Sequence, residues 1–123
     1  MASTNDRYAA LLSKLHEATL QKRISWNIDD FSEEVETTVG KNRLGMIVMD
    51  KGNAKSVRVR VYSADGSVID SFDDDDFGTA SAPTGYTSYW FFMNEMIRAA
   101  KRSASGADKV IDDLISELDN GIL

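Results

Sequence analysis

The chain has 123 residues, of which 42% are hydrophobic and 28% are charged, and its formal net charge is −6. These values are typical of a folded domain and exclude a disordered chain, whose apolar fraction would be lower. The chain has no cysteine and one histidine, His16, so disulfides and zinc sites of the Cys/His kind are excluded. We expect a single α+β domain over residues 1–123 and no metal or other cofactor.

The acidic balance also restricts the partners. A net charge of −6 opposes phosphate backbones and anionic lipid, which disfavours nucleic acid as a partner. The sequence has no apolar run of about 18 residues and no signal-peptide pattern at its start. We therefore expect a cytoplasmic protein that does not enter a membrane.

The first predicted element is a helix from Asn5 to Gln21. Tyr8, Leu11, Leu12, Leu15 and Ala18 recur at spacings of three and four, which places them on one helical face. A serine and a threonine at positions 3 and 4 are candidate N-caps.

The middle of the chain changes to the alternation of a β-sheet. Every second side chain is apolar or large from Phe31 to Val39, and the alternation returns in 44–48 and 57–61. Glycine-containing turns separate these segments, and a further short strand follows Gly66. The pattern predicts an antiparallel meander of four or five strands.

Four-residue connections at 40–43 and 51–54 predict how these strands pair. The inward rows are then Val35/Val48/Val57, Thr37/Met46/Val59 and Val39/Leu44/Val61. The same register places Glu36, Ile47 and Arg58 in one outward row and sets Arg60 beside Asp70. We expect Val48 to be buried between Val35 and Val57.

Two helices are predicted to complete the domain. Residues 73–83 lack a period and are expected to form a loop, mobile at its acidic end. A second helix is expected from Thr84 or Thr87 to about Arg102. A third follows Ser105, which forms a capping-box pattern with Asp108, and its apolar face holds Val110, Ile111, Leu114, Ile115 and Leu118. We expect this third helix either to complete the helical layer or to reach a partner.

Residue patterns that carry chemistry are weak in this chain. His16 is the natural candidate for a general base, but the chain contains no nucleophile turn that would complete a Ser/His site, and we interpret it as a helix-flank residue. The aspartates of 73–76 and Gly78 partly fit a calcium loop, yet Thr84 stands where the bidentate glutamate would be required. We therefore predict neither a catalytic site nor a metal site.

Surplus apolar surface is the remaining signal. Aromatic residues crowd positions 86–92, more than one helical stripe can bury, and the outward sheet face contains apolar residues as well. The candidate partner contacts are Ile47, Met49, Tyr62, Tyr86, Phe91, Asp73, Asp74, Asp75 and Asp76.

The function indicated by these features is a non-enzymatic protein–protein interaction module, expected to be a homodimer. Three alternatives stay open at this stage. The first is a secretion-chaperone-like protein, because the composition resembles that of small acidic α+β dimers in that group. The second is an acidic decoy that imitates nucleic acid, and the third is a small-ligand binder or enzyme with a pocket under the 73–83 loop.

Overall fold

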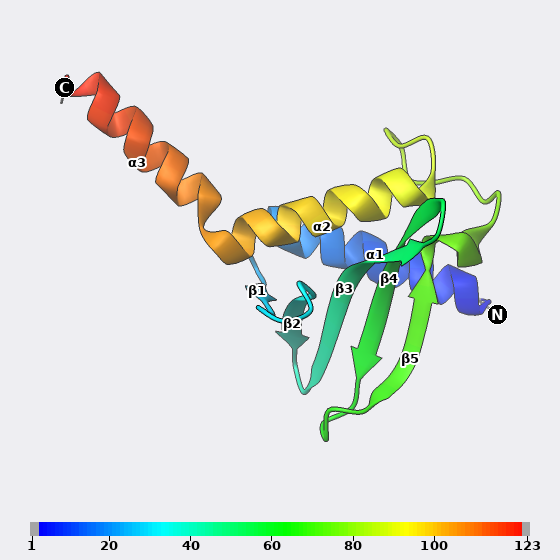
Figure 1. The fold of residues 1–123 in the computed structure, drawn as a ribbon. Helices are drawn as coiled ribbons and strands as arrows, with labels where there is room; N and C mark the ends of the chain where they lie inside the picture. The colour runs from blue at the N-terminus through cyan, green and yellow to red at the C-terminus, as the bar shows by residue number, and fades with distance from the viewer. Residues whose placement is uncertain (1–2, 122–123) are drawn as a thin grey trace.

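The computed structural model describes residues 3–121, which form a layer of two helices packed on one face of an antiparallel sheet (Figure 1). The elements are α1 (Thr4–Leu20), β1 (Asn27–Ile28), β2 (Val35–Val39), β3 (Asn42–Lys51), β4 (Ala54–Tyr62), β5 (Val68–Asp73), a 3-10 helix η1 (Asp74–Phe77), α2 (Tyr89–Ser105) and α3 (Ala107–Asp119). The strands lie side by side in chain order, as a meander. The predicted α+β class and element order are confirmed.

Helix α1 begins with a reciprocal cap. The Asp6 amide donates to Ser3 Oγ over 3.1 Å, and the Ser3 amide donates to the Asp6 carboxylate over 3.2 Å. Two of the free amides at the helix start are thereby satisfied. At the other end, Trp26 Nε1 donates to Thr19 Oγ1 over 3.0 Å, so the buried indole fastens the following segment to α1.

The register between β2 and β3 differs from the prediction by two residues. The turn contains only Gly40 and Lys41, so Val39 pairs with Asn42 and Val35 pairs with Met46. Gly40 has a φ of +63°, the conformation that such a two-residue turn requires. A shift of two residues keeps every side chain on its predicted face. The residues predicted to face inward therefore still do so.

The pairing of β3 with β4 follows the prediction, with Val48 opposite Val57 and Met46 opposite Val59. The prediction that Val48 is buried is wrong, because its side chain is 38% exposed. Since β2 begins opposite Met46, Val48 has no neighbour on that side.

The strand predicted to begin at Phe31 begins only at Val35, as β2. Residues 29–34 form the turn between β1 and β2, and the side chain of Asp29 accepts from the Phe31 amide over 3.1 Å and from Ser32 Oγ over 2.9 Å. Phe31 is therefore in a loop and is 98% exposed. The alternation failed here because an aspartate with a serine nearby favours a local turn over strand pairing.

Helix α2 supplies the centre of the core. Its N-cap is Ser88, whose Oγ accepts from the Phe91 amide, so the helix starts a few residues after the predicted position. Its buried face packs on α1 and the sheet and consists of Phe92, Met93, Met96, Ile97 and Ala100.

The Val48–Val57 pair offers a matched test of the corrected register. Val57→Thr introduces a hydroxyl at a fully buried position and should lower the free energy of unfolding by about 1–3 kcal/mol. Val48→Thr, directly opposite but partly exposed, should change it by less than about 0.5 kcal/mol. Urea denaturation of both variants measures the difference, and equal losses would contradict the assigned burial.

Candidate functional site

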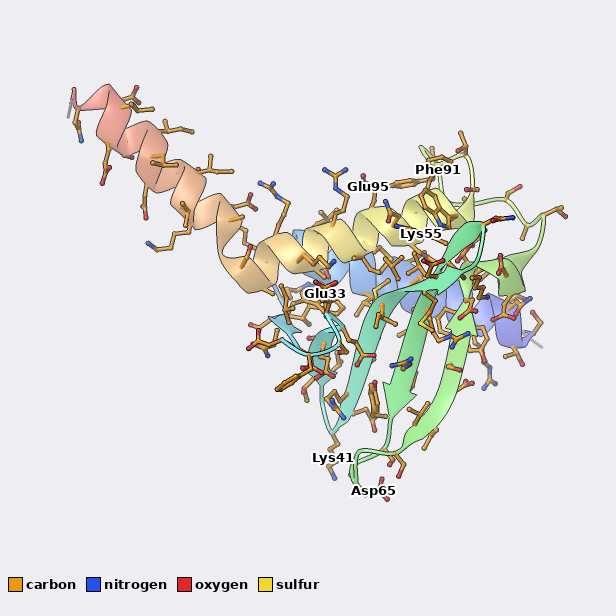
Figure 2. All side chains as sticks on the ribbon, in the orientation of Figure 1. Glu33, Lys41, Lys55, Asp65, Phe91 and Glu95 are labelled. Carbon is orange, nitrogen blue, oxygen red and sulfur yellow. The ribbon has the colours of Figure 1, made fainter. Side chains whose placement is uncertain are left out.

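Helix α3 is the most exposed of the three α-helices. None of its residues is buried, although five of them are large and apolar. Figures 1 and 2 show α3 leaving the end of α2 and projecting from the body. The exposed fractions range from 43% to 63% for Val110, Ile111, Leu114, Ile115 and Leu118. We call these five residues the α3 stripe.

A single residue directs α3 away from the body. Gly106 has a φ of +69°, which ends α2 in the left-handed conformation that favours glycine. Arg102 and Asp108 form an ion pair across this bend. The predicted Ser105 capping box is wrong, because Ser105 is still the last residue of α2 and its Oγ faces the Arg102 carbonyl.

Acidic side chains border the α3 stripe on both sides. At 3.6 residues per turn, Asp112 and Asp119 lie along one edge and Asp113 and Glu117 along the other. The only basic residue of α3, Lys109, lies on the opposite face and pairs with Asp113 over 3.1 Å. The stripe is therefore an apolar surface inside an acidic frame.

A second uncovered surface lies between α1 and the inner face of the sheet. The β2–β3 and β4–β5 turns extend beyond the helices in Figure 1, and a cavity of about 540 Å³ opens there. Its lining residues are Leu11, Lys14, Leu15, Ala18, Arg23, Ile24, Val39, Asn42, Arg43, Leu44, Val61 and Ile69. We call this cavity the α1 groove.

The lining of the α1 groove is apolar with a basic rim. Val39 is 48% and Ile69 is 63% exposed, so two aliphatic side chains meet water at its edge. Lys14 and Arg23 contribute two positive charges at the rim, and no acidic residue is among the lining residues. The charge of the groove is thus opposite to that of α3.

Another cavity, of about 490 Å³, lies near the bend between α2 and α3. Charges of both signs line it, and two of its ion pairs join Arg98 to Glu95 and Arg102 to Asp108. Neither cavity is lined by residues of 73–83. The expected pocket under that loop is therefore not one of these two.

The outer sheet face holds a buried carboxylate. Glu34 is 3% exposed and accepts from Tyr62 Oη over 2.6 Å and from Arg60 over 3.1 Å. Burial raises the pKa of Glu34, opposed by the hydrogen bond from Tyr62. Arg60 lies opposite Ser71 rather than beside Asp70 as predicted, because β5 contains an irregularity next to Val61.

Tyr62 and its neighbours close this face with polar groups. The guanidinium of Arg43 lies 4.1 Å from the centre of the Tyr62 ring and pairs with Glu36 over 2.9 Å. Burial raises the pKa of Tyr62, as does its bond to Glu34. Tyr62, a predicted partner contact, is 8% exposed and leaves little surface for another molecule.

The aspartate run forms the end of β5 and the 3-10 helix η1. Asp73 ends β5 and accepts from Arg58 over 2.7 Å and from Lys51 over 2.8 Å. Asp74 accepts from the Val57 amide over 2.7 Å, and Asp76 accepts from the Asp73 amide over 2.8 Å. The prediction that a loop begins at residue 73 is wrong, because Asp73 belongs to β5 and residues 74–77 form η1. The carboxylates accept bonds from residues of β3, β4 and β5.

Two further carboxylate bonds complete this arrangement. Asp75 pairs with Lys51 over 3.1 Å, and Asp74 also accepts from Ser56 Oγ over 2.7 Å. Among residues 3–121, no group of three or more histidine, aspartate or glutamate side chains is arranged to hold a metal ion.

The two aromatic candidates, Tyr86 and Phe91, differ in burial. Tyr86 is half-buried, with its ring centre 5.0 Å from that of Phe92 and 6.3 Å from that of His16. Burial lowers the pKa of His16, with a smaller opposing effect of Glu95. Phe91 is 53% exposed and lies at the start of α2, at the same end as Lys55 (Figure 2).

The remaining candidates, Ile47 and Met49, are half-buried on the outer sheet face. Exposed apolar groups gather elsewhere, with five on α3 and with Val39 and Ile69 at the α1 groove. Sequence reasoning identified the α3 stripe but missed the groove, because its lining comes from α1, β2, β3, β4 and β5 together. The sequence did contain one signal for the groove. The strands have more inward-facing apolar residues than two helices can cover.

The chain matches no family model, no curated protein and no solved structure. Among the residues that the structure describes, no helix combines the length and apolarity needed to cross a bilayer. The function is therefore inferred from the geometry of this chain.

The contact of Glu34 with Gly45 provides one test of the outer face. A Cβ atom at position 45 would lie 2.5 Å from the Glu34 Cδ atom, so Gly45→Ala should displace a buried carboxylate and lower the free energy of unfolding by about 1–3 kcal/mol. In a Glu34→Ala background the same change should cost about 1 kcal/mol less. Urea denaturation of the four proteins measures this coupling, and an equal cost in both backgrounds would contradict it.

The pH dependence of stability tests Asp73. Arg58 and then Lys51 lower its pKa in the folded chain, against the opposing effect of burial. This contribution is present above the unfolded pKa of about 4 and is lost as the pH falls through the lowered folded value. Asp73→Asn should therefore reduce stability at pH 7 by about 1–2 kcal/mol and differ less from the parent at pH 3.

Denaturation at both pH values measures this effect. Asp30→Asn, at an exposed carboxylate outside the aspartate run, is the matched control and should stay close to the parent throughout. A difference between Asp73→Asn and the parent that does not shrink at pH 3 would contradict the assignment.

Proposed function

We propose that this chain is a non-enzymatic protein–protein interaction module that acts as a homodimer, with α3 as its binding element. The observation that carries the proposal is a helix of 13 residues with five large apolar side chains and no buried residue. Such a surface on a soluble chain marks an interaction site.

Helix stability supports the same proposal. An isolated helix of this length is marginal in water, because its few hydrogen bonds barely offset the ordering of the backbone. Helices in proteins gain most of their stability from packing of an apolar face, and no residue among 3–121 buries the stripe of α3. A partner would supply the missing packing.

The alternative functions receive less support. The carboxylates of 73–76 accept hydrogen bonds inside the fold, which weakens the case for an acidic decoy of nucleic acid. His16 lies against Tyr86 and Phe92, an environment that favours a packing role over general base catalysis. A secretion-chaperone role would be one form of the same protein-binding function, and cytoplasmic localisation fits it.

Light scattering at micromolar concentration tests the proposal. The parent chain should have about twice the monomer mass of 13.6 kDa, because two apolar faces are removed from water together. Leu114→Glu places a charge in the stripe and should give a monomer. Ser116→Glu makes the same addition on the opposite face of α3 and should leave the dimer intact.

Two results would overturn the proposal. One is a monomer mass for the parent chain across the micromolar range. The other is an equal effect of the two glutamate variants, which would mean that the stripe has no special role. Thermal melting of each variant verifies that residues 3–105 remain folded.

A further inference from the structure

We infer that α3 of one copy of this chain docks in the α1 groove of a second copy, and that the exchange is reciprocal. This inference rests on the proposed function and specifies the surface that receives α3. It uses the two apolar surfaces that the fold leaves uncovered.

The groove of the same copy cannot receive α3. One residue, Gly106, joins α2 to α3, and the bend directs α3 away from the body (Figure 1). The groove lies under α1 and the sheet turns, and no residue of α2 or α3 lines it. The apolar stripe of α3 can therefore be buried only against another molecule.

Charge complementarity favours the α1 groove of a second copy as the binding site for α3. Three acidic residues of α3 form no ion pair with another described residue, and all three border the stripe: Asp112, Glu117 and Asp119. Lys14 and Arg23 lie at the rim of the groove and form none of the ion pairs of the described chain. Docking would bring these opposite charges together around an apolar contact.

Pairing of α3 with a second α3 is disfavoured by the same charges. Each helix has five acidic residues and one basic residue, and the acidic residues border both edges of the stripe. Two stripes in contact would place acidic edges beside acidic edges, which is destabilising. The basic rim of the groove has no such conflict.

Reciprocal docking also explains why one chain holds both surfaces. In a dimer with twofold symmetry, each copy gives its α3 and receives the other's, so both uncovered surfaces are used twice. Closed symmetry further prevents open-ended association. Without the dimer, the α3 stripe and the α1 groove would remain in contact with water.

Cross-linking of introduced cysteines tests this arrangement on the full chain, because the chain has no cysteine of its own. Ile69→Cys marks the groove and Ile115→Cys marks the stripe. The two variants are mixed, one of them labelled with ¹⁵N, and treated with a short bis-maleimide. The expected product contains one copy of each variant, at several times the yield of either variant alone.

The matched control is Lys109→Cys, on the opposite face of α3, which should cross-link poorly to Ile69→Cys. A dominant Ile115–Ile115 product in a dimeric sample would overturn the groove docking while leaving the proposed function standing. A monomer mass with no cross-linked product would overturn both.

Charge reversal gives an independent readout. Lys14→Glu with Arg23→Glu should raise the dimer dissociation constant at least tenfold, without lowering the melting temperature of the monomer. Mixing this variant with Asp112→Lys, Glu117→Lys should restore a heterodimer, because each groove then meets an α3 of opposite charge. An unchanged dissociation constant in the groove variant would overturn the inference.

Discussion

The packing of α2 on the sheet is the interaction on which the rest of the structure depends. Helix α2 contacts α1, η1 and the first four strands, and its buried face occupies the centre of the core. The position of α2 determines which part of the sheet is shielded from water, and its C-terminal end determines where α3 starts. A helix that crossed the sheet elsewhere would cover different strands and direct α3 along another path.

The uncovered surfaces follow from that placement. No residue of α2 lines the α1 groove, so the turn end of the sheet is covered by α1 alone and retains exposed aliphatic groups such as Ile69. The outer sheet face has no comparable need for cover, because ion pairs and the stems of Arg43 and Arg60 lie over it. Apolar surplus therefore gathers on one side of the molecule and on α3.

The order of elements could be predicted because local patterns specify it. Apolar spacing located α1 and α3, and strand alternation located the meander, even where β2 was paired two residues out of register. The turn at Gly40–Lys41 was misjudged since both turn lengths keep the same faces inward. Side-chain competition at Asp29 delays the start of β2 to Val35, which periodicity does not reveal.

Only one of the two candidate surfaces could be predicted from the sequence, because only one of them is formed by a single local segment. The α3 stripe lies within one helix and is visible as spacing, whereas the α1 groove is assembled from distant segments and exists only once they pack. The aspartates of 73–76 show the opposite failure. Their density suggested an exposed surface, yet Asp73 and Asp74 are fixed by donors from the neighbouring strands.

The contact between Glu34 and Gly45 has a consequence for how this sequence can vary over time. Position 45 lies in an ordinary strand conformation, so the backbone itself would accept most side chains there. The Glu34 carboxyl group occupies the space that a Cβ would need. A side chain can enter position 45 only after position 34 has lost its long acid, so substitutions at these two positions are constrained to arise in a fixed order. Related chains that keep the glutamate should therefore keep the glycine as well, whereas chains without the glutamate can have other residues at position 45.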